Sequence, residues 1–138
     1  MKRLLPYLLG AVSVVVVAFG AGYAVGQSKA PAEAKGLKIE VIRLFDLAGE
    51  IDGGAGRTLR MRRTTIQPGG ASPLHDHVGR PEVTYVLQGA ITYHQEGMPD
   101  RIVSAGESNP SGMNTKGGHW VENRGSVPVV LISADIDK

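Results

Sequence analysis

Four side chains of types that bind transition metals stand out, and three of them lie within eight residues of each other. They are His75, His77 and Glu82, with His119 nearer the C-terminus. Along an extended strand, successive side chains alternate between faces, so His75 and His77 point the same way while Asp76 points away. The turn-forming residues from Val78 to Pro81 would then return Glu82 beside the two imidazoles.

His119 begins a second strand-like run, four residues before Asn123. It would complete a set of three imidazoles and one carboxylate, which suits a divalent transition ion better than calcium or magnesium. We therefore expect one bound divalent metal, with iron, manganese, nickel, copper and zinc all left open.

The spacing of these residues resembles the first conserved motif of a known family, the cupins. The motif is read here as G-x5-H-x-H-x4-E-x6-G, from Gly69 to Gly89. The resemblance covers residues 37–135. It implies a small antiparallel barrel of the jelly-roll kind, with the metal inside and His75, His77, Glu82 and His119 as its ligands.

A second cupin motif is matched in part. His119 and Asn123 fit its last section, and Gly106 fits its opening glycine. Pro110 and Gly112 keep the P-x-G spacing of its middle section but come too early. The sequence thus departs from the family pattern just before His119.

The N-terminus is typical of a membrane-targeting segment. Residues 4–26 carry no charge, and Lys2 and Arg3 precede them. This run exceeds a signal-peptide core of roughly 7 to 15 residues and matches the roughly 20 that span a bilayer. We expect a retained anchor, with a cleaved signal as the alternative. Either way, the positive-inside rule places the rest of the chain in the periplasm or outside the cell.

The remaining chain has room for one domain. Residues 27–36 read as a linker and residues 37–138 as the cupin domain. A pair of barrels could come only from dimerisation, so a homodimer is left open. Without Lys2 and Arg3 the chain has 13 basic and 13 acidic residues, which does not favour a nucleic-acid partner. The chain has no cysteine, so neither disulfides nor a lipid-modified cysteine are available.

Short apolar runs separated by glycine-containing turns predict an all-β domain. Turns are expected at 52–54, 68–70, 88–89, 96–97, 105–106 and 124–125. The expected strands are residues 37–45, 58–66, 74–77, 83–87, 91–95, 101–103, 119–122 and 127–133.

We expect structural roles for several other polar and aromatic side chains. Arg60 and Arg62 share one face of a strand, and a solvent-exposed outer face is the default for them, with binding of a substrate anion as the alternative. His94 is expected at the surface or in a hydrogen bond, and Trp120 in packing on the side opposite His119. Asn123 fits either support of a ligand or a strand-end turn.

Three functions fit this reading. The first is a metal enzyme acting on a small organic substrate, since a resemblance to quercetin-dioxygenase-like cupins implies an oxygenase in which a redox-active metal carries the reaction. The second is a membrane-tethered cupin that binds or senses a small molecule without converting it. The third uses the metal only for stability. No separate catalytic residue is identified, because the sequence has no cysteine nucleophile and no Ser-His-Asp pattern.

Overall fold

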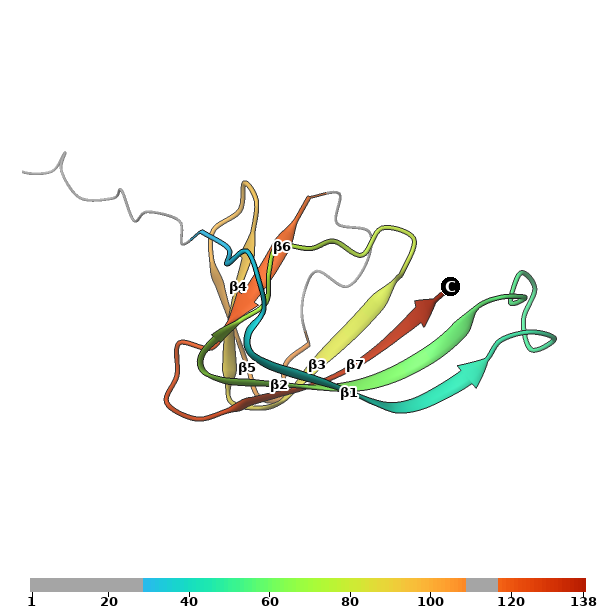
Figure 1. Cartoon of the computed structure of the whole chain (residues 1–138), viewed down its shortest axis with the longest axis horizontal. Coiled ribbons are helices and arrows are strands. Elements are labelled where there is room, and N and C mark those ends of the chain that lie inside the picture. The colour runs from blue at the N-terminus through green and yellow to red at the C-terminus, as the bar shows by residue number, and fades with distance from the viewer. Residues whose placement is uncertain (1–28, 109–116) are drawn as a thin grey trace, which may run out of the picture.

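The computed structural model describes residues 29–108 and 117–138, and every helix or strand within these ranges is a β-strand (Figure 1). The strands are β1 (Lys35–Asp46), β2 (Thr58–Ala71), β3 (Glu82–Gln88), β4 (Ala90–Gln95), β5 (Arg101–Ser104), β6 (His119–Glu122) and β7 (Val129–Asp137). The predicted anchor or signal segment, residues 1–26, lies outside the described residues, as do Pro110 and Gly112. The described ranges contain no helix with the length and hydropathy needed to cross a membrane.

The strands form one antiparallel sheet that curves into a nearly closed barrel. Their order is β3-β7-β2-β6-β4-β5, and β1 pairs with β2. The two ends of this order meet where the amide of Val86 on β3 donates to the carbonyl of Glu107 over 2.9 Å, just after β5. The amide of Gly106 returns a bond of 2.9 Å to the carbonyl of Val86. The all-β, jelly-roll expectation is confirmed.

Three predictions of local structure were wrong. The expected strand 127–133 is β7, which begins at Val129 and continues to Asp137. The expected turn at 68–70 is an irregularity within β2, which continues to Ala71 and changes partners there from β7 to β6. Gly69 adopts a φ of 70°, and a Cβ on Gly70 would lie 2.8 Å from the carbonyl oxygens of Gln67 and Lys35. Glycine is therefore required where the chain changes partners. The expected strand 74–77 is reduced to a single bridge between His75 and His119.

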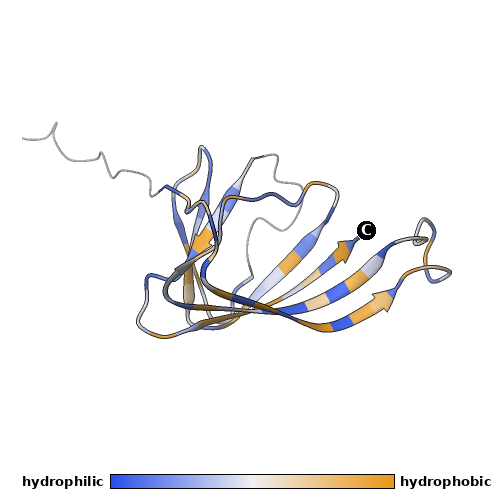
Figure 2. Ribbon diagram, viewed as in Figure 1, coloured by the Kyte–Doolittle hydropathy of each residue, from blue (hydrophilic) through white to orange (hydrophobic). Residues whose placement is uncertain are grey.

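The core fills the part of the barrel that β4, β5 and β6 cover. Ile66, Val86, Ile91 and Val129 are essentially inaccessible to solvent there. Along the strands hydrophobic and hydrophilic residues alternate, as the changing colours in Figure 2 show. This alternation is the period of two that a strand with one buried face requires.

Beyond this core, β1, β2, β7 and β3 continue as a sheet past the covered region (Figure 1). On this part the pairing register places Asp135 of β7 opposite Arg60 of β2 on one side and opposite Glu82 of β3 on the other. The register therefore brings charged side chains from three strands together, next to the histidines.

Candidate metal centre

The structure brings three of the four predicted ligands into one cluster. The ring centroids of His75 and His119 lie 4.4 Å apart, those of His77 and His119 5.0 Å, and those of His75 and His77 5.2 Å. One nitrogen from each ring can be chosen so that all three lie within 4.8 Å of one another. Three imidazoles at this spacing could hold one metal ion.

Backbone hydrogen bonds fix the positions of these rings. The amide of His75 donates to the carbonyl of His119 over 3.0 Å, and the amide of His119 donates back over 2.9 Å. The amide of Arg80 donates to the carbonyl of His77 over 3.0 Å, closing the predicted turn. Asp76 is exposed, as alternation along the chain requires, and its Oδ1 accepts the amide of Val78 at 3.1 Å.

The protonation states of the rings suit metal binding. Nδ1 of His75 donates to the carbonyl of Pro73 over 2.9 Å, which leaves its Nε2 without a proton. Nδ1 of His77 and Nδ1 of His119 are buried and make no well-formed hydrogen bond to any described residue. Burial lowers the pKa of His75, and burial together with the neighbouring His75 and His77 lowers the pKa of His119 to about 4. His75 and His119 are therefore neutral at pH 7, with lone pairs available for a cation.

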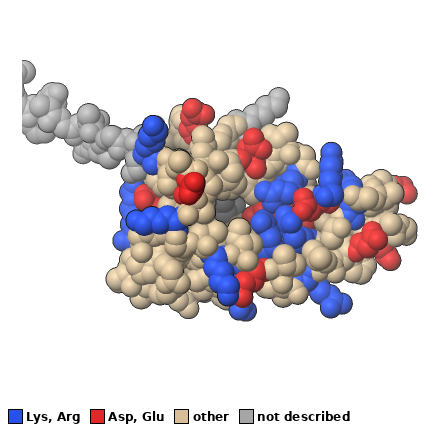
Figure 3. All heavy atoms as spheres, viewed as in Figure 1, with Lys and Arg blue, Asp and Glu red and all other residues tan. Residues whose placement is uncertain are grey.

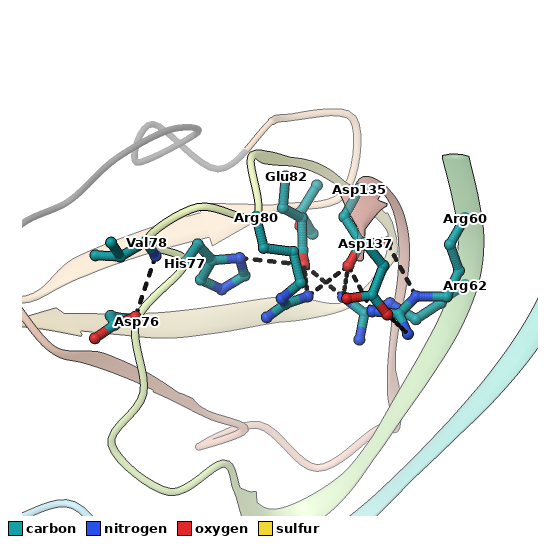
Figure 4. Close-up of polar contacts among 10 residues, drawn as sticks. Arg60, Arg62, Asp76, His77, Val78, Arg80, Glu82, Asp135 and Asp137 are labelled. Carbon is teal, nitrogen blue, oxygen red and sulfur yellow. Dashed lines mark hydrogen bonds and ion pairs between the residues drawn. The ribbon is translucent and has the colours of Figure 1, made fainter. Parts of the chain in front are cut away.

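Glu82, the predicted fourth ligand, lies beside the cluster but also belongs to a set of ion pairs (Figure 4). Its Oε2 lies 3.3 Å from Nδ1 of His77, 3.2 Å from Nη1 of Arg80 and in contact with Nη2 of Arg62. Its Oε1 accepts the hydroxyl of Thr84 at 3.0 Å. Burial disfavours the carboxylate, yet His77 and Arg62 outweigh it and lower the pKa of Glu82. Metal ligation by this carboxylate stays a prediction.

The expectation that Arg60 and Arg62 lie on a solvent-exposed outer face was wrong. Their side chains are only 21% and 14% exposed, and both contact Asp135, whose side chain is fully buried. Arg80 also forms an ion pair with Asp135, and Arg60 forms a second ion pair with Asp137 over 2.6 Å. Figure 3 shows basic and acidic side chains gathered on the side where the sheet continues past the barrel. Burial opposes ionisation of Asp135, but bonds from Arg60 and Arg80 lower its pKa.

A cavity of about 350 Å³ joins the histidines to this cluster. One wall carries the three imidazoles, and Arg62, Arg80 and Glu82 contribute the charged part. The apolar walls come from Leu37, Ile39, Ile91, Val121 and Leu131. Thr84 also lines the cavity, while Val86 is buried in the core. The volume is within the range of small-molecule sites.

The other singled-out residues are structural. His94 is buried, and its two nitrogens lie 2.7 Å from Asp100 and 2.9 Å from Glu122. Trp120 stacks on it with ring centroids 3.8 Å apart, on the face opposite His119, as expected. Asn123 is a turn residue, because its Nδ2 donates to the carbonyls of Ile66 and Val127 at 2.9 and 2.8 Å. The partners of His94 come from other segments, so no local sequence pattern predicts them.

Solved structures with a similar fold can be identified. They include KdgF from Halomonas sp. (TM-score 0.55, 16% identity, covering 78% of this chain and 94% of that one). They also include a Cupin 2 conserved barrel domain protein from Salinispora arenicola CNS-205 (TM-score 0.54, 16% identity, 72% and 74%). An oxalate oxidase in complex with the substrate analogue glycolate has a TM-score of 0.53 and 24% identity, covering 73% of this chain and 51% of that one. These identities are low, so the likeness shows the fold alone.

Among curated proteins, none matches the sequence significantly. The family model described as "Cupin domain" matches residues 62–135, more than half of the chain, and this range includes His75, His77 and His119. The motif spacing, the barrel and this match agree, and the chain belongs to the cupin family.

Proposed function

We propose that this cupin is a metal-dependent enzyme of the oxygenase type, acting on a small organic substrate. One observation carries the proposal: the three-histidine cluster opens directly onto the cavity of about 350 Å³. A metal used only for stability needs no adjoining space, whereas a catalytic metal needs a position for substrate.

The residues present fit a divalent metal. His75, His77 and His119 would hold it, and within the described part of the chain the buried Nδ1 atoms of His77 and His119 make no well-formed hydrogen bond. Glu82 is the proposed fourth ligand, since its Oε2 lies 3.3 Å from the ring of His77. When bound, such a metal would polarise a coordinated oxygen or, if redox-active, exchange electrons with substrate and dioxygen. The protein would contribute the orientation of substrate and a largely apolar surrounding.

Elemental analysis tests the proposal. The full chain would be purified without chelators or metal-affinity resin, next to the double variant His75→Ala/His77→Ala. We expect about one transition metal per chain in the wild type and none in the variant. Iron, manganese, nickel or copper would direct a screen for substrate-dependent oxygen consumption. Equal metal content in the two proteins would refute the ligand assignment.

A binding or sensing function is the second candidate. The ion pairs that the Glu82 carboxylate makes with arginines favour it. Glu82 is the only carboxylate among the described residues that line the cavity, and Arg62 and Arg80 both contact it. A carboxylate held as an ion is a poor proton donor at pH 7. Stoichiometric ligand binding by the metal-loaded protein, without oxygen consumption or product, would establish this alternative.

We also propose an extracytoplasmic location, supported by the uncharged run 4–26 after Lys2 and Arg3. Membrane fractionation at high salt, with N-terminal sequencing of the recovered protein, tests it. A chain beginning near Met1 in the membrane fraction indicates an anchor, and a soluble chain beginning after residue 24 or 34 indicates a cleaved signal. Homodimerisation stays a prediction, to be checked by the mass of the protein in solution.

A further inference from the structure

The charged part of the cavity wall has more cations than anions. Arg60, Arg62 and Arg80 share carboxylate partners, of which Glu82 and Asp135 are buried, with side chains 13% and 0% exposed. The further carboxylate in the cluster, Asp137, is 37% exposed and pairs with Arg60 alone. Arg62 and Arg80, but not Arg60, line the cavity. Asp135 and Asp137 do not line it either, so two guanidinium groups and one carboxylate face a molecule inside the cavity.

The two guanidinium groups in the cavity also retain hydrogen-bonding capacity. A guanidinium has five N–H donors. The bonds that Arg62 makes to Glu82 and Asp135 all use Nη2, and its Nε is buried without a partner among the described residues. Both carboxylate contacts of Arg80 use Nη1. A buried donor without an acceptor is unfavourable, so an anionic oxygen placed here would relieve it.

Glu82 connects these guanidinium groups to the histidines. The same oxygen, Oε2, contacts Arg62 and Arg80 and lies 3.3 Å from His77. If Glu82 ligates a metal through Oε2, the oxygen near His77, this oxygen cannot keep its full interaction with both arginines, because a carboxylate oxygen has a limited number of lone-pair positions. Metal uptake would then leave more of the positive charge of Arg62 and Arg80 unbalanced by Glu82 and directed at the cavity.

We propose that Arg62 and Arg80 form an anion subsite for a small organic carboxylate, and that metal binding opens this subsite by drawing Glu82 away. This inference rests on the proposed metal function and adds the substrate class to it. Leu37, Ile39 and Leu131 on the apolar walls would pack against the hydrocarbon part of the ligand. Neutral ligands of the same shape would bind more weakly, since they leave the guanidinium groups unpaired.

Benzoate and its neutral analogue benzamide test the subsite. Their binding to the full chain would be measured by calorimetry with and without zinc, which supports no redox turnover, and zinc uptake would be titrated separately. We expect zinc-loaded protein to bind benzoate about tenfold or more tighter than benzamide. Arg62→Gln and Arg80→Gln should each remove most of that preference. Arg63→Gln is the matched control, because Arg63 is exposed on the opposite face of β2.

The role of Glu82 is tested by Glu82→Gln. Without metal, this variant should bind benzoate better than the metal-free wild type, because its neutral amide no longer occupies the two guanidinium groups. By linkage, benzoate should tighten zinc binding to the wild type by the same factor that zinc tightens benzoate binding. Absence of this coupling, or of a gain in Glu82→Gln, would overturn the proposal that metal opens the subsite.

Other outcomes separate the two proposals. If zinc binds but benzoate affinity is the same in the wild type, Arg62→Gln and Arg80→Gln, the anion subsite is wrong and the metal function stands. If zinc does not bind at all, the metal function is wrong. The proposed coupling between metal binding and anion binding is then wrong as well. Circular dichroism and thermal melting would confirm that each variant is folded, and Arg62→Lys, which keeps the charge, should recover part of the benzoate affinity.

Discussion

Replacing Asp135 with Asn should destabilise the fold more than any other single charge removal in the cluster. The carboxylate of Asp135 is fully buried and accepts bonds from Arg60 at 3.0 and 2.8 Å, with Arg62 at 3.1 Å and Arg80 also in contact. The amide would leave three guanidinium groups, each at most 26% exposed, without their shared anion. Breaking a buried ion pair in this way costs about 3 to 5 kcal/mol.

We take about 3 kcal/mol, because the amide keeps one acceptor oxygen, and this corresponds to a fall in Tm of about 15 °C for a domain of this size. Urea and thermal unfolding of the full chain, followed by circular dichroism at pH 7, would measure it. The matched control is Asp137→Asn, since Asp137 makes one partly exposed pair with Arg60 and should contribute less than about 1 kcal/mol. A loss below about 1 kcal/mol for Asp135→Asn, or equal losses for the two variants, would refute the reasoning.

Three further predictions concern other parts of the molecule. Because the pKa of His119 is lowered to about 4 from 6.5, the unfolded state binds the proton more tightly, so the metal-free protein should lose up to about 3 kcal/mol of stability as the pH falls from 6.5 to 4. Urea unfolding across this range would show it, and an unchanged slope in His119→Asn would contradict it. Gly89→Ala should destabilise by about 2 kcal/mol, since Gly89 has a φ of 78° and a Cβ would lie 2.9 Å from Val129; thermal melting that matches the wild type would contradict this. His94→Gln should lower stability by about 2 kcal/mol, because it removes a buried ring that contacts the carboxylates of Asp100 and Glu122 and stacks on Trp120, while metal content by elemental analysis stays unchanged. A loss of metal in this variant would contradict the structural role assigned to His94.

Much of the site was predictable from local spacing. A single intervening residue placed His75 and His77 on one side of the chain, and the glycine-punctuated pattern predicted most of the strands. The strand containing His119 has the expected bounds. These features follow from the period of two and from turn chemistry, which depend on neighbouring residues alone.

The ion-pair cluster was not predictable in the same way. Alternation along β2 shows that Arg60 and Arg62 share a face, but not which face is turned inward. Preference for buried apolar residues favours the opposite face, yet Leu59 and Met61 are 41% and 42% exposed. The arginines point inward because Asp135, 75 residues from Arg60, pairs with them across the sheet. Asp135 itself could have indicated the inward face, because it shares a strand face with the apolar residues that begin β7.

The paired backbone bonds between His75 and His119 have a kinetic consequence. These residues are 44 positions apart, and their two amide-to-carbonyl bonds form only when β6 has docked beside the segment that carries His75. A metal shared by the two rings would then act as a cross-link that requires nearly complete assembly. If docking of β6 follows the rate-limiting step of folding, the metal would slow unfolding far more than it speeds folding. Metal loading would in that case prolong the lifetime of the folded barrel, and its effect would appear mainly in the unfolding rate.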